Sequence, residues 1–258
     1  MSSLADDNVS LAHLSSVIEM DTVLSGNVLR LVNSVLYGRR GTVSSVRHAL
    51  GIIGLTKLRN YVLGLSVSQL WKKVHTAENW SIGRFNQHSM ATAVMGDLIV
   101  QRLPVDNSEA AFAAGLLHDI GRFMIAVALP DECERILQLY VSSHDPLEVC
   151  EQEIIDVSHA ELGAAALARW NLPVSIQRAI AAHHQGPMSP LPQDPLDLAR
   201  VVLVANELAD HFGYSVVAVE SERARDNRVL FEEVGLSREA DRINIEFEGE
   251  IAALLATI

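Results

Sequence analysis

The sequence contains only two cysteines and no segment that resembles a secretion signal. Its first ten residues, MSSLADDNVS, are polar and acidic, and they lack the basic and then apolar order of a signal peptide. We therefore interpret Cys133 and Cys150 as reduced thiols of a cytoplasmic protein, because disulfides are rare in that compartment.

Long apolar stretches are also missing. Apolar residues make up 49% of the chain, but Arg, Lys, Asp or His interrupts every run well before about 18 residues, the length that a membrane-spanning helix requires. The sequence therefore predicts no transmembrane helix and no membrane partner. The chain has 258 residues, which is enough to bury a sizeable core.

Positive charge is scarce, with 20 Lys and Arg against 32 Asp and Glu, for a net charge of −12. This balance argues against a nucleic-acid partner, because binding to a phosphate backbone relies on clustered Lys and Arg. The best local concentration of positive charge consists of Arg39, Arg40, Arg47, Lys57 and Arg59. We interpret this cluster as a solvated face.

Helical periodicity runs through most of the sequence. Apolar residues recur at spacings of three and four, as in the stripe Val28, Leu31, Val32 and Val35 and in the stripe Leu55, Leu58, Val62 and Leu65. The sequence therefore predicts an all-α fold of packed helical layers. We place an N-terminal helical subdomain at residues 1–78 and a second one, with a C-terminal helical extension, at residues 79–258. The stretch between them, WKKVHTAENWS, has no strong Pro or Gly linker, so we expect one continuous core.

Three local patterns set further boundaries. Ser158 and Glu161 form an S-x-x-E capping box, which predicts a helix from His159 to about residue 170. Asp194 as N-cap and Pro195 at the first helical position predict the start of a later helix. The alternating stretch INIEFEGE, at residues 243–250, predicts a short extended piece, and EIAALLATI after it predicts a closing helix.

An ordered series of histidines accompanies the helices, each at or near a helix end or on a helix face. Neutral imidazole and carboxylate groups are ligands that suit Fe, Mn or Zn. An adjacent His–Asp pair can supply ligands to two metal ions about 3.5–4 Å apart, an arrangement that suits phosphoester hydrolysis. The candidate ligands are His88, His118, Asp119, His159, His183 and His184.

Each of these residues also has a plain structural interpretation. A single mid-helix histidine is usually a core or surface residue, and two histidines at a helix C-terminus, such as His183 and His184, favour the negative end of the helix dipole. The order of the whole series is what favours a metal site. The remaining histidines have no companions in a motif, and we interpret them as structural or surface residues: His13, His48, His75, His144 and His211.

The series H…HD…H…HH resembles the HD superfamily of metal-dependent phosphohydrolases, and its six-ligand order resembles the HD-GYP branch. A longer resemblance connects the chain to the HDOD (HD-related output domain) family, through IEMDTVLSGNVLRLVNSVLYG, VSSVRHALGIIGLTKLRNYVLGL, AFAAGLLHDIGR, DVSHAELGAAALARWNLP and IQRAIAAHHQ. These stretches span roughly residues 10 to 210. The resemblance implies an all-α fold of two helical layers and a role in bacterial signal transduction, as an output or regulatory module without an agreed catalytic activity.

The HD pattern carries over onto this chain with one ligand changed. The closing Asp of an HD site is expected on the last core helix, in the stretch VANELAD, where this chain has Asn206. Asn is neutral and a weaker ligand than a carboxylate. Asp210 lies one helical turn further on, and it would replace the missing ligand only if the helix shifted. The positions that match the family pattern are His88, His118, Asp119, His159, His183 and His184.

Two further departures concern the HD-GYP branch alone. Its GYP motif is missing after the paired histidines, where this chain reads HHQGPMSP. The branch has a phosphate-binding Lys after HDIG, whereas this chain has Arg122, which can still bind phosphate but is not interchangeable with Lys.

We therefore expect a non-catalytic signalling module of the HDOD type that acts through a signalling protein partner. In that case His118 and Asp119 make hydrogen bonds within the helical core. Two alternatives stay open, a metal- or nucleotide-binding sensor and an active metal-dependent phosphohydrolase, both of which use the degenerate HD site. The sequence does not predict the oligomeric state.

Overall fold

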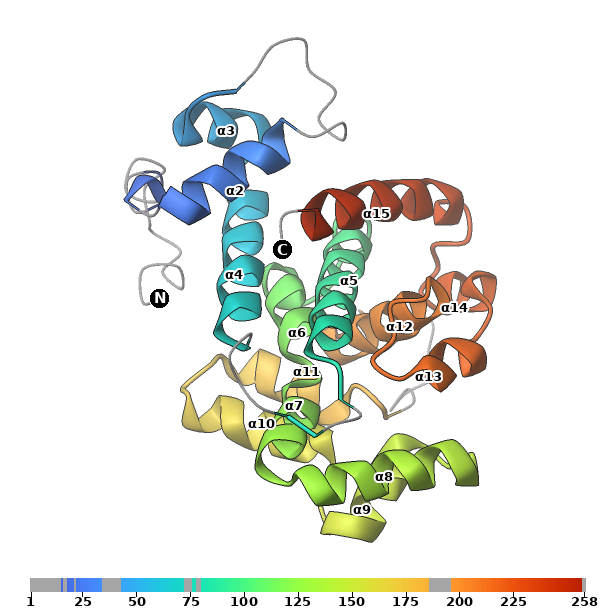
Figure 1. The fold of residues 1–258 in the computed structure, drawn as a ribbon. Helices are drawn as coiled ribbons and strands as arrows, with labels where there is room; N and C mark the ends of the chain where they lie inside the picture. The colour runs from blue at the N-terminus through green and yellow to red at the C-terminus, as the bar shows by residue number, and fades with distance from the viewer. Residues whose placement is uncertain are drawn as a thin grey trace. The chain divides into compact units, whose positions relative to one another are not determined.

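The computed structural model describes residues 15, 18–20, 22–33, 43–71, 76–77, 80–185 and 196–256. These residues form helices, and among them an isolated parallel bridge between Val105 and Leu196 is the one piece of β structure (Figure 1). The predicted all-α fold is confirmed. The chain divides into two compact units, residues 1–72 with 245–258 and residues 73–244.

The described residues of the first unit form three helices and most of a fourth, α15, which begins in the second unit. Val28, Leu31 and Val32 of α2 are at most 4% exposed, so the predicted stripe forms the buried face of that helix. The hydroxyl of Tyr61 in α4 donates to the carbonyl of Asn27 in α2 at 3.0 Å. The bounds are α2 (Thr22–Val32), α3 (Val46–Ile53), α4 (Leu55–Trp71) and α15 (Ala240–Leu255).

Leu55 departs from the stripe predicted for α4. It is 36% exposed, because it is the first residue of the helix and precedes the buried face that begins at Leu58. Of the predicted basic cluster, Arg47 is exposed and Lys57 forms an ion pair with Glu250. Four residues of these predictions lie outside the part whose side chains the structure describes: Val35, Arg39, Arg40 and Leu65.

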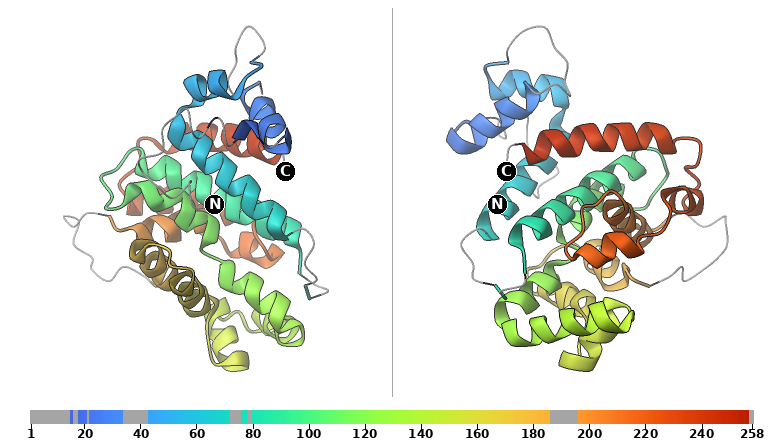
Figure 2. Two further views of the ribbon diagram at one scale, coloured as in Figure 1. Left: turned by 90° about the vertical axis from the view of Figure 1, so that its left-hand side faces the viewer. Right: turned by 45° about the vertical axis from the view of Figure 1, so that its right-hand side comes forward.

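The second unit is built around α5, which packs against α6 and α12, while α10 packs against α7 and α11 (Figure 2). The middle of α5 is rich in small and apolar residues, and Ala91, Ala93 and Met95 are completely buried. The helices that build the unit are α5 (Ile82–Val100), α6 (Ala111–Leu117), α7 (Ile120–Ala128), α8 (Pro130–Ser143), α9 (Leu147–Ile155), α10 (His159–Arg169), α11 (Val174–Ala182), α12 (Leu198–His211), α13 (Ala218–Arg223) and α14 (Asn227–Glu233), with a 3-10 turn, η3 (Ser108–Ala110), before α6.

Capping residues set the start of two helices that matter for the site. The hydroxyl of Ser158 accepts from the amide of Glu161, and the Glu161 carboxylate accepts from the amide of Ser158, so the predicted capping box is confirmed. Asp197 caps α12 by accepting from the amide of Arg200 at 2.8 Å. The predicted cap at Asp194 and Pro195 lies outside the described residues, but Leu196 and Asp197 are not helical, so α12 begins later than predicted, with Asp197 as its cap.

The predicted extended piece at residues 243–250 is wrong, because these residues lie in α15. Ile243, Phe247 and Ile251 are spaced by four and are all completely buried, so they form one face of a helix. This longer-range spacing outweighs the local alternation of polar and apolar residues. The predicted closing helix at EIAALL is confirmed as the continuation of α15.

One stretch, Ser108–Ala128, is long and apolar enough to cross a membrane by length and composition alone. Its most apolar window is 72% buried within the protein, as the core helix of a soluble protein would be. Cys133 and Cys150 are both buried and free, as predicted. Burial raises the pKa of the Cys133 thiol to about 11.

Candidate metal centre

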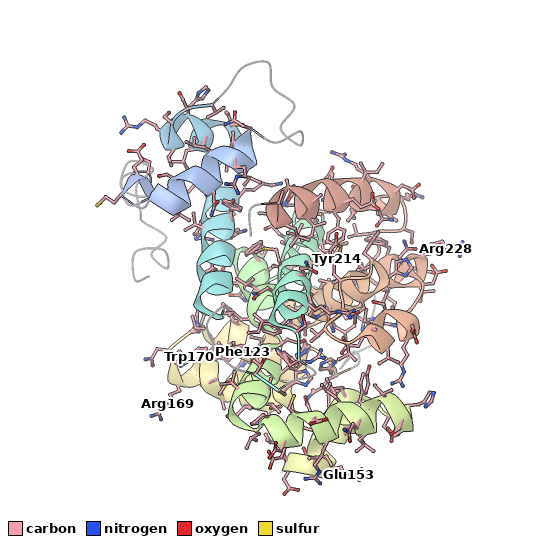
Figure 3. All side chains as sticks on the ribbon, in the orientation of Figure 1. Phe123, Glu153, Arg169, Trp170, Tyr214 and Arg228 are labelled. Atoms are coloured by element: carbon pink, nitrogen blue, oxygen red, sulfur yellow. The ribbon has the colours of Figure 1, made fainter. Side chains whose placement is uncertain are left out.

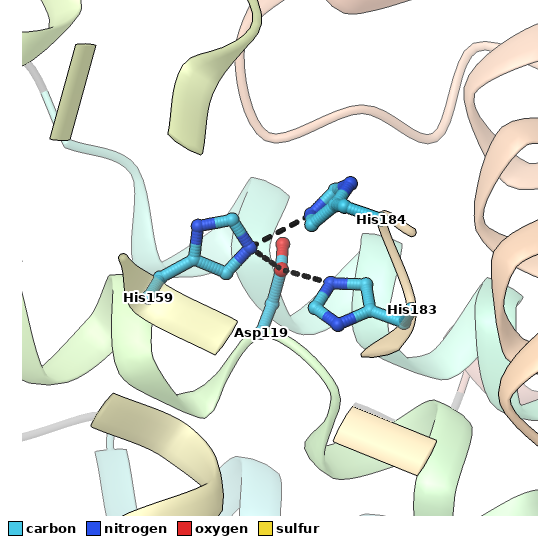
Figure 4. A group of neighbouring side chains, drawn as sticks. All are labelled: Asp119, His159, His183 and His184. Atoms are coloured by element: carbon cyan, nitrogen blue, oxygen red, sulfur yellow. Dashed lines mark hydrogen bonds and ion pairs between the residues drawn. The ribbon is translucent and has the colours of Figure 1, made fainter. Parts of the chain in front are cut away.

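The structure brings all six candidate ligands together in the second unit. Their donor atoms form two sets in which every atom lies within 4.8 Å of the others, and Asp119 belongs to both sets. We call one set the His184 group, formed by Asp119, His159, His183 and His184 (Figure 4). The other is the His88 group, formed by His88, His118 and Asp119. The ligands come from α5 (His88), the α6–α7 junction (His118, Asp119), the start of α10 (His159) and the end of α11 (His183, His184).

Two glycines allow the helices of the site to approach each other. A Cβ atom on Gly121 would lie 1.9 Å from the carbonyl oxygen of His159, so only glycine permits α7 to touch the first turn of α10 there. A Cβ atom on Gly115 would lie 2.8 Å from the Cα of Ala93, in the contact between α6 and α5. Because Gly115 and Gly121 flank the His–Asp pair, these close contacts bring His118 and Asp119 near the histidines of α5 and α10.

Four of the five histidine rings are held in the same way, by a hydrogen bond at Nδ1. The acceptors are backbone carbonyl oxygens in three cases and a carboxylate in the fourth, so Nδ1 carries the proton in each ring. The bonds are His88 to Tyr214 O (2.6 Å), His118 to Gly115 O (2.7 Å), His183 to Ile180 O (2.6 Å) and His159 to Glu151 Oε2 (2.7 Å). Tyr214 is labelled in Figure 3.

A neutral ring that is protonated at Nδ1 has a bare lone pair at Nε2. The Nε2 atoms of His88 and His118 face each other at 3.2 Å. Those of His159 and His184 face each other at 2.8 Å. In the His88 group two lone pairs therefore point at each other without a proton between them, which is unfavourable unless a cation lies nearby.

The carboxylate of Asp119 lies among these nitrogens and is itself an acceptor. Its Oδ1 is 3.5 Å from Nε2 of His118 and 3.4 Å from Nε2 of His159. Nε2 of His183 lies 3.7 Å from the same oxygen and makes no hydrogen bond within the described residues. Acceptor atoms from several helices thus converge on one small, buried region.

Burial keeps the rings of the His88 group neutral. It lowers the pKa of His118 to about 3, although Asp119 opposes the shift, and it also lowers the pKa of His88. Burial alone would raise the pKa of Asp119, but His118 and Arg122 outweigh it and hold that pKa well below its usual value. The group therefore presents neutral imidazoles and an ionised carboxylate, the protonation states that metal binding requires.

The His184 group has a different electrostatic environment. Burial acts to lower the pKa of His159, but the Glu151 carboxylate outweighs it and the pKa is raised. Burial and the neighbouring His183 hold the pKa of His184 well below its usual value. The side chain of His184 is 26% exposed, whereas those of His159 and Asp119 are at most 2% exposed.

The donor set fits a transition-metal ion. Two nitrogens bound to one ion at about 2.0–2.1 Å lie roughly 3 Å apart, close to both Nε2–Nε2 separations given above. Imidazole nitrogens held by Nδ1 hydrogen bonds to carbonyl or carboxylate oxygens are the usual arrangement of metal-binding histidines. Nε2 of His183, which has no hydrogen-bond partner within the described residues, also lies near Asp119, like Nε2 of His118 and His159. The residues present are therefore suited to hold a metal ion.

Asn206 and Asp210, both on α12, are outside the two donor groups. Asp210 Oδ1 lies 3.5 Å from Nδ1 of His88, the ring nitrogen that already bonds to Tyr214, and so on the side away from the donor atoms. Burial and Glu220 raise the pKa of Asp210 well above its usual value. The side-chain oxygen of Asn206 is buried and makes no hydrogen bond within the described residues.

Arg122 is fully engaged by carboxylates. Its guanidinium donates to Asp119 Oδ2 at 2.9 Å and to Glu220 Oε1 at 2.7 Å, and it lies 5.9 Å from the ring centre of Trp80. The side chain is only 7% exposed. In this arrangement Arg122 balances the charge of the HD aspartate and is not free to bind a phosphate group.

Sequence reasoning missed two carboxylates that hold the site. Glu151 in α9 accepts from both the amide and Nδ1 of His159, each at 2.7 Å, and Glu220 in α13 holds Arg122. Glu151 precedes His159 by eight residues, and a turn lies between them. Glu220 is nearly a hundred residues from Arg122. No sequence spacing connects these pairs, because tertiary packing alone brings them together.

The remaining histidines do not join the site where the structure describes them. His48, His144 and His211 are exposed, as predicted. His13 and His75 lie outside the described residues. These exposed histidines provide controls for any metal-binding experiment.

The family model of the HDOD domain matches residues 1–186 of the chain, a range that includes all six candidate ligands. The chain belongs to the HDOD family. Asn206 and Glu220 lie beyond the matched range. The HDOD match confirms the resemblance inferred from the sequence motifs.

The chain is also similar to known relatives in sequence and to solved structures in fold. An uncharacterized protein from Treponema pallidum (strain Nichols) is 28% identical over 204 residues, which cover 75% of this chain and only 37% of that protein. A crystal structure of an HDOD domain protein from Geobacter sulfurreducens, 24% identical, has a TM-score of 0.77 and covers 99% of this chain and 87% of its own. The MmoQ response regulator from Methylococcus capsulatus (strain Bath), 26% identical, has a TM-score of 0.54 and covers 92% of this chain and 90% of its own.

Proposed function

We propose that this protein is a non-catalytic signalling module whose buried histidine–aspartate site binds a transition-metal ion, with Fe, Mn and Zn as the candidates. The observation that carries the proposal is the common orientation of four imidazoles. Each is fixed at Nδ1, and each directs a bare Nε2 toward the region around Asp119. The similarity to a response regulator supports the signalling role.

A bound ion would stabilise the second unit by joining its helices. The members of the His184 group come from the α6–α7 junction, α10 and α11, so one ion there would link segments that are far apart in the sequence. Binding that occurs only in the folded state adds to stability by mass action. Metal occupancy is then coupled to the rigidity of the unit, which a partner protein can sense.

Two observations favour binding over catalysis. Of the six candidate ligands, all but His184, which is 26% exposed, have side chains at most 2% exposed, whereas a catalytic metal site keeps a position open for water or substrate. Arg122, the residue placed to bind a substrate phosphate, is held by two carboxylates. A phosphoester would reach the site only after a rearrangement of both features.

The second candidate function is a metal-dependent phosphohydrolase. It is favoured by one observation, that Asp119 belongs to both donor groups, as a carboxylate does between two metal ions. Two ions about 3.5–4 Å apart would stabilise the attacking and leaving oxygens of a phosphoester. Turnover of bis(p-nitrophenyl) phosphate with Mn²⁺, abolished by His118→Ala and Asp119→Ala, would establish this function in place of the first.

Elemental analysis of the protein purified without chelator tests the proposed function. We expect close to stoichiometric Fe, Mn or Zn in the unaltered protein and in the control His48→Ala, which removes an exposed histidine of the first unit. His159→Ala should carry only traces of metal. Traces in the unaltered protein, both as purified and after loading with each metal, would contradict the proposal.

The protein partner and the cytoplasmic location are parts of the same proposal. An output module without turnover acts by presenting a surface, so its partner is a signalling protein and not a nucleic acid or a membrane. The net charge of −12 supports the exclusion of nucleic acid. Isolation of native complexes from cells, with and without a metal chelator, identifies the partner and tests whether its binding depends on metal.

A further inference from the structure

The two donor groups share Asp119 but differ in the charges that surround them. Both contain imidazoles whose Nε2 atoms lie at distances suited to one ion. The two groups differ in the side chains that contact the ligands from outside the donor region. Since a metal ion adds at least two positive charges to a buried site, these neighbours decide where it binds.

The His88 group already contains a fixed cation. Arg122 donates to Asp119 Oδ2 at 2.9 Å, and this is the oxygen that lies 3.6 Å from Nε2 of His88. Glu220 holds the guanidinium from the opposite side at 2.7 Å. A metal ion bound to Oδ2 in this group would have to share that oxygen with Arg122 and lie close to a buried positive charge.

The same group has no second anionic ligand. Asn206 occupies the position at which the HD pattern supplies an aspartate, and an amide oxygen brings no charge. Asp210 lies beside Nδ1 of His88, on the side of the ring that faces away from His118. The His88 group therefore offers two neutral nitrogens and the Asp119 carboxylate, of which one oxygen, Oδ2, is already paired with a cation.

The His184 group is supported by negative charge instead. Glu151, only 2% exposed, accepts from the backbone amide and the Nδ1 of His159, which increases the basicity of the Nε2 donor. Glu148 lies 3.8 Å from Nδ1 of His184. His184 is 26% exposed, so this group also has the side through which an ion can enter.

We propose that the protein binds one metal ion per chain, in the His184 group, and that Arg122 takes the place of a second cation in the His88 group. The inference rests on the proposed metal-binding function. It assigns Asp119 Oδ1 to the ion and Asp119 Oδ2 to the guanidinium. In this chain the His–Asp pair thus serves one metal ion and one arginine.

Metal stoichiometry after loading with Mn²⁺ and removal of free ion by gel filtration tests this inference. We expect one Mn²⁺ per chain in the unaltered protein and in His88→Ala, and a loss of at least about tenfold in affinity in His184→Ala, the size of effect that loss of a site contact typically has. His48→Ala serves as the control for exposed histidines. Circular dichroism confirms that each variant is folded before its metal content is measured.

A second variant is designed to let the His88 group bind a metal ion as well. The triple substitution Arg122→Met, Glu220→Gln and Asn206→Asp removes the buried cation together with the charge of its partner and supplies the absent carboxylate. We expect its stoichiometry to rise from one Mn²⁺ to two, and the added ion to be lost again when His88→Ala is included. If this variant does not fold, the comparison of His88→Ala with His184→Ala still decides the location.

The outcomes separate this inference from the proposed function. Two ions in the unaltered protein, or a single ion that is lost in His88→Ala and kept in His184→Ala, would overturn the single-ion inference and leave metal binding intact. No bound ion in the unaltered protein would overturn both.

Discussion

The His88 group and the His184 group contain the same kinds of ligand, yet their neighbours differ. Behind the first lies the buried Arg122 guanidinium, itself paired with Glu220, and behind the second lies the buried Glu151 carboxylate, to which no buried Arg or Lys is bonded within the described residues. In the proposed arrangement, Arg122 of α7, held by Glu220 of α13, and Glu151 of α9 select between two otherwise similar groups of candidate ligands.

Removal of the shared ligand should have the largest effect on metal binding. Asp119→Asn keeps the shape of the side chain but removes the charge that both groups use. Loss of a residue behind a metal ligand costs about 10–100-fold in affinity, and loss of the shared ligand should cost at least that. Isothermal titration with Mn²⁺ measures the change, and an affinity within threefold of the unaltered protein would show that the ion does not contact Asp119.

The glycines beside the His–Asp pair test how tightly each group depends on close helix packing. Gly121→Ala should destabilise the protein by about 1–3 kcal/mol or more, because its Cβ would overlap the carbonyl of His159. Gly115→Ala should cost less, since the closest atom lies at 2.8 Å and not at 1.9 Å. Gly51→Ala is the control, with nothing within 4 Å, and should be neutral or stabilising by roughly 0.5–1 kcal/mol. Urea unfolding that gives equal values for all three variants would contradict the described contacts.

Glu151→Gln addresses the difference between the groups most specifically. It leaves a hydrogen-bond acceptor for Nδ1 of His159 but removes the negative charge, so we expect about a 10–100-fold loss of metal affinity. Glu148→Gln is the matched control at a partly exposed residue, 3.8 Å from His184, and should change affinity by less than about fivefold, the range of an exposed ion pair. Equal effects of the two substitutions would show that burial of the carboxylate is unimportant.

Two helix caps provide the smallest effect. Ser158→Ala and Ser45→Ala each remove an N-cap hydroxyl and should each cost about 0.5–2 kcal/mol in stability. Only Ser158 precedes a ligand, so only Ser158→Ala should also weaken metal binding. If both variants weaken it equally, the effect follows general stability and not the position of His159.

The sequence predicted the helices and the six residues that the structure brings together because both depend on local patterns. The capping box at Ser158 and the apolar stripe of α2 have fixed spacings, and the histidines follow an order typical of the HD superfamily. The extended piece at residues 243–250 was predicted wrongly because a local alternation competed with a four-residue spacing that only packing makes decisive.

The role of Arg122 was not predictable from the sequence. Its position suggested a phosphate-binding residue, whereas the structure pairs it with Asp119 and with Glu220 from α13. Glu151 escaped prediction for the same reason. Glu151 and Glu220 belong to helices outside the motif, and only the folded chain brings them to the site.

The most direct test of metal binding is a crystal structure with diffraction data collected on both sides of the absorption edge of the bound metal. The account predicts one anomalous peak, surrounded by Asp119, His159, His183 and His184, with Arg122 still paired to Asp119. The absence of any peak in metal-loaded crystals, or a peak between His88 and His118, would contradict it.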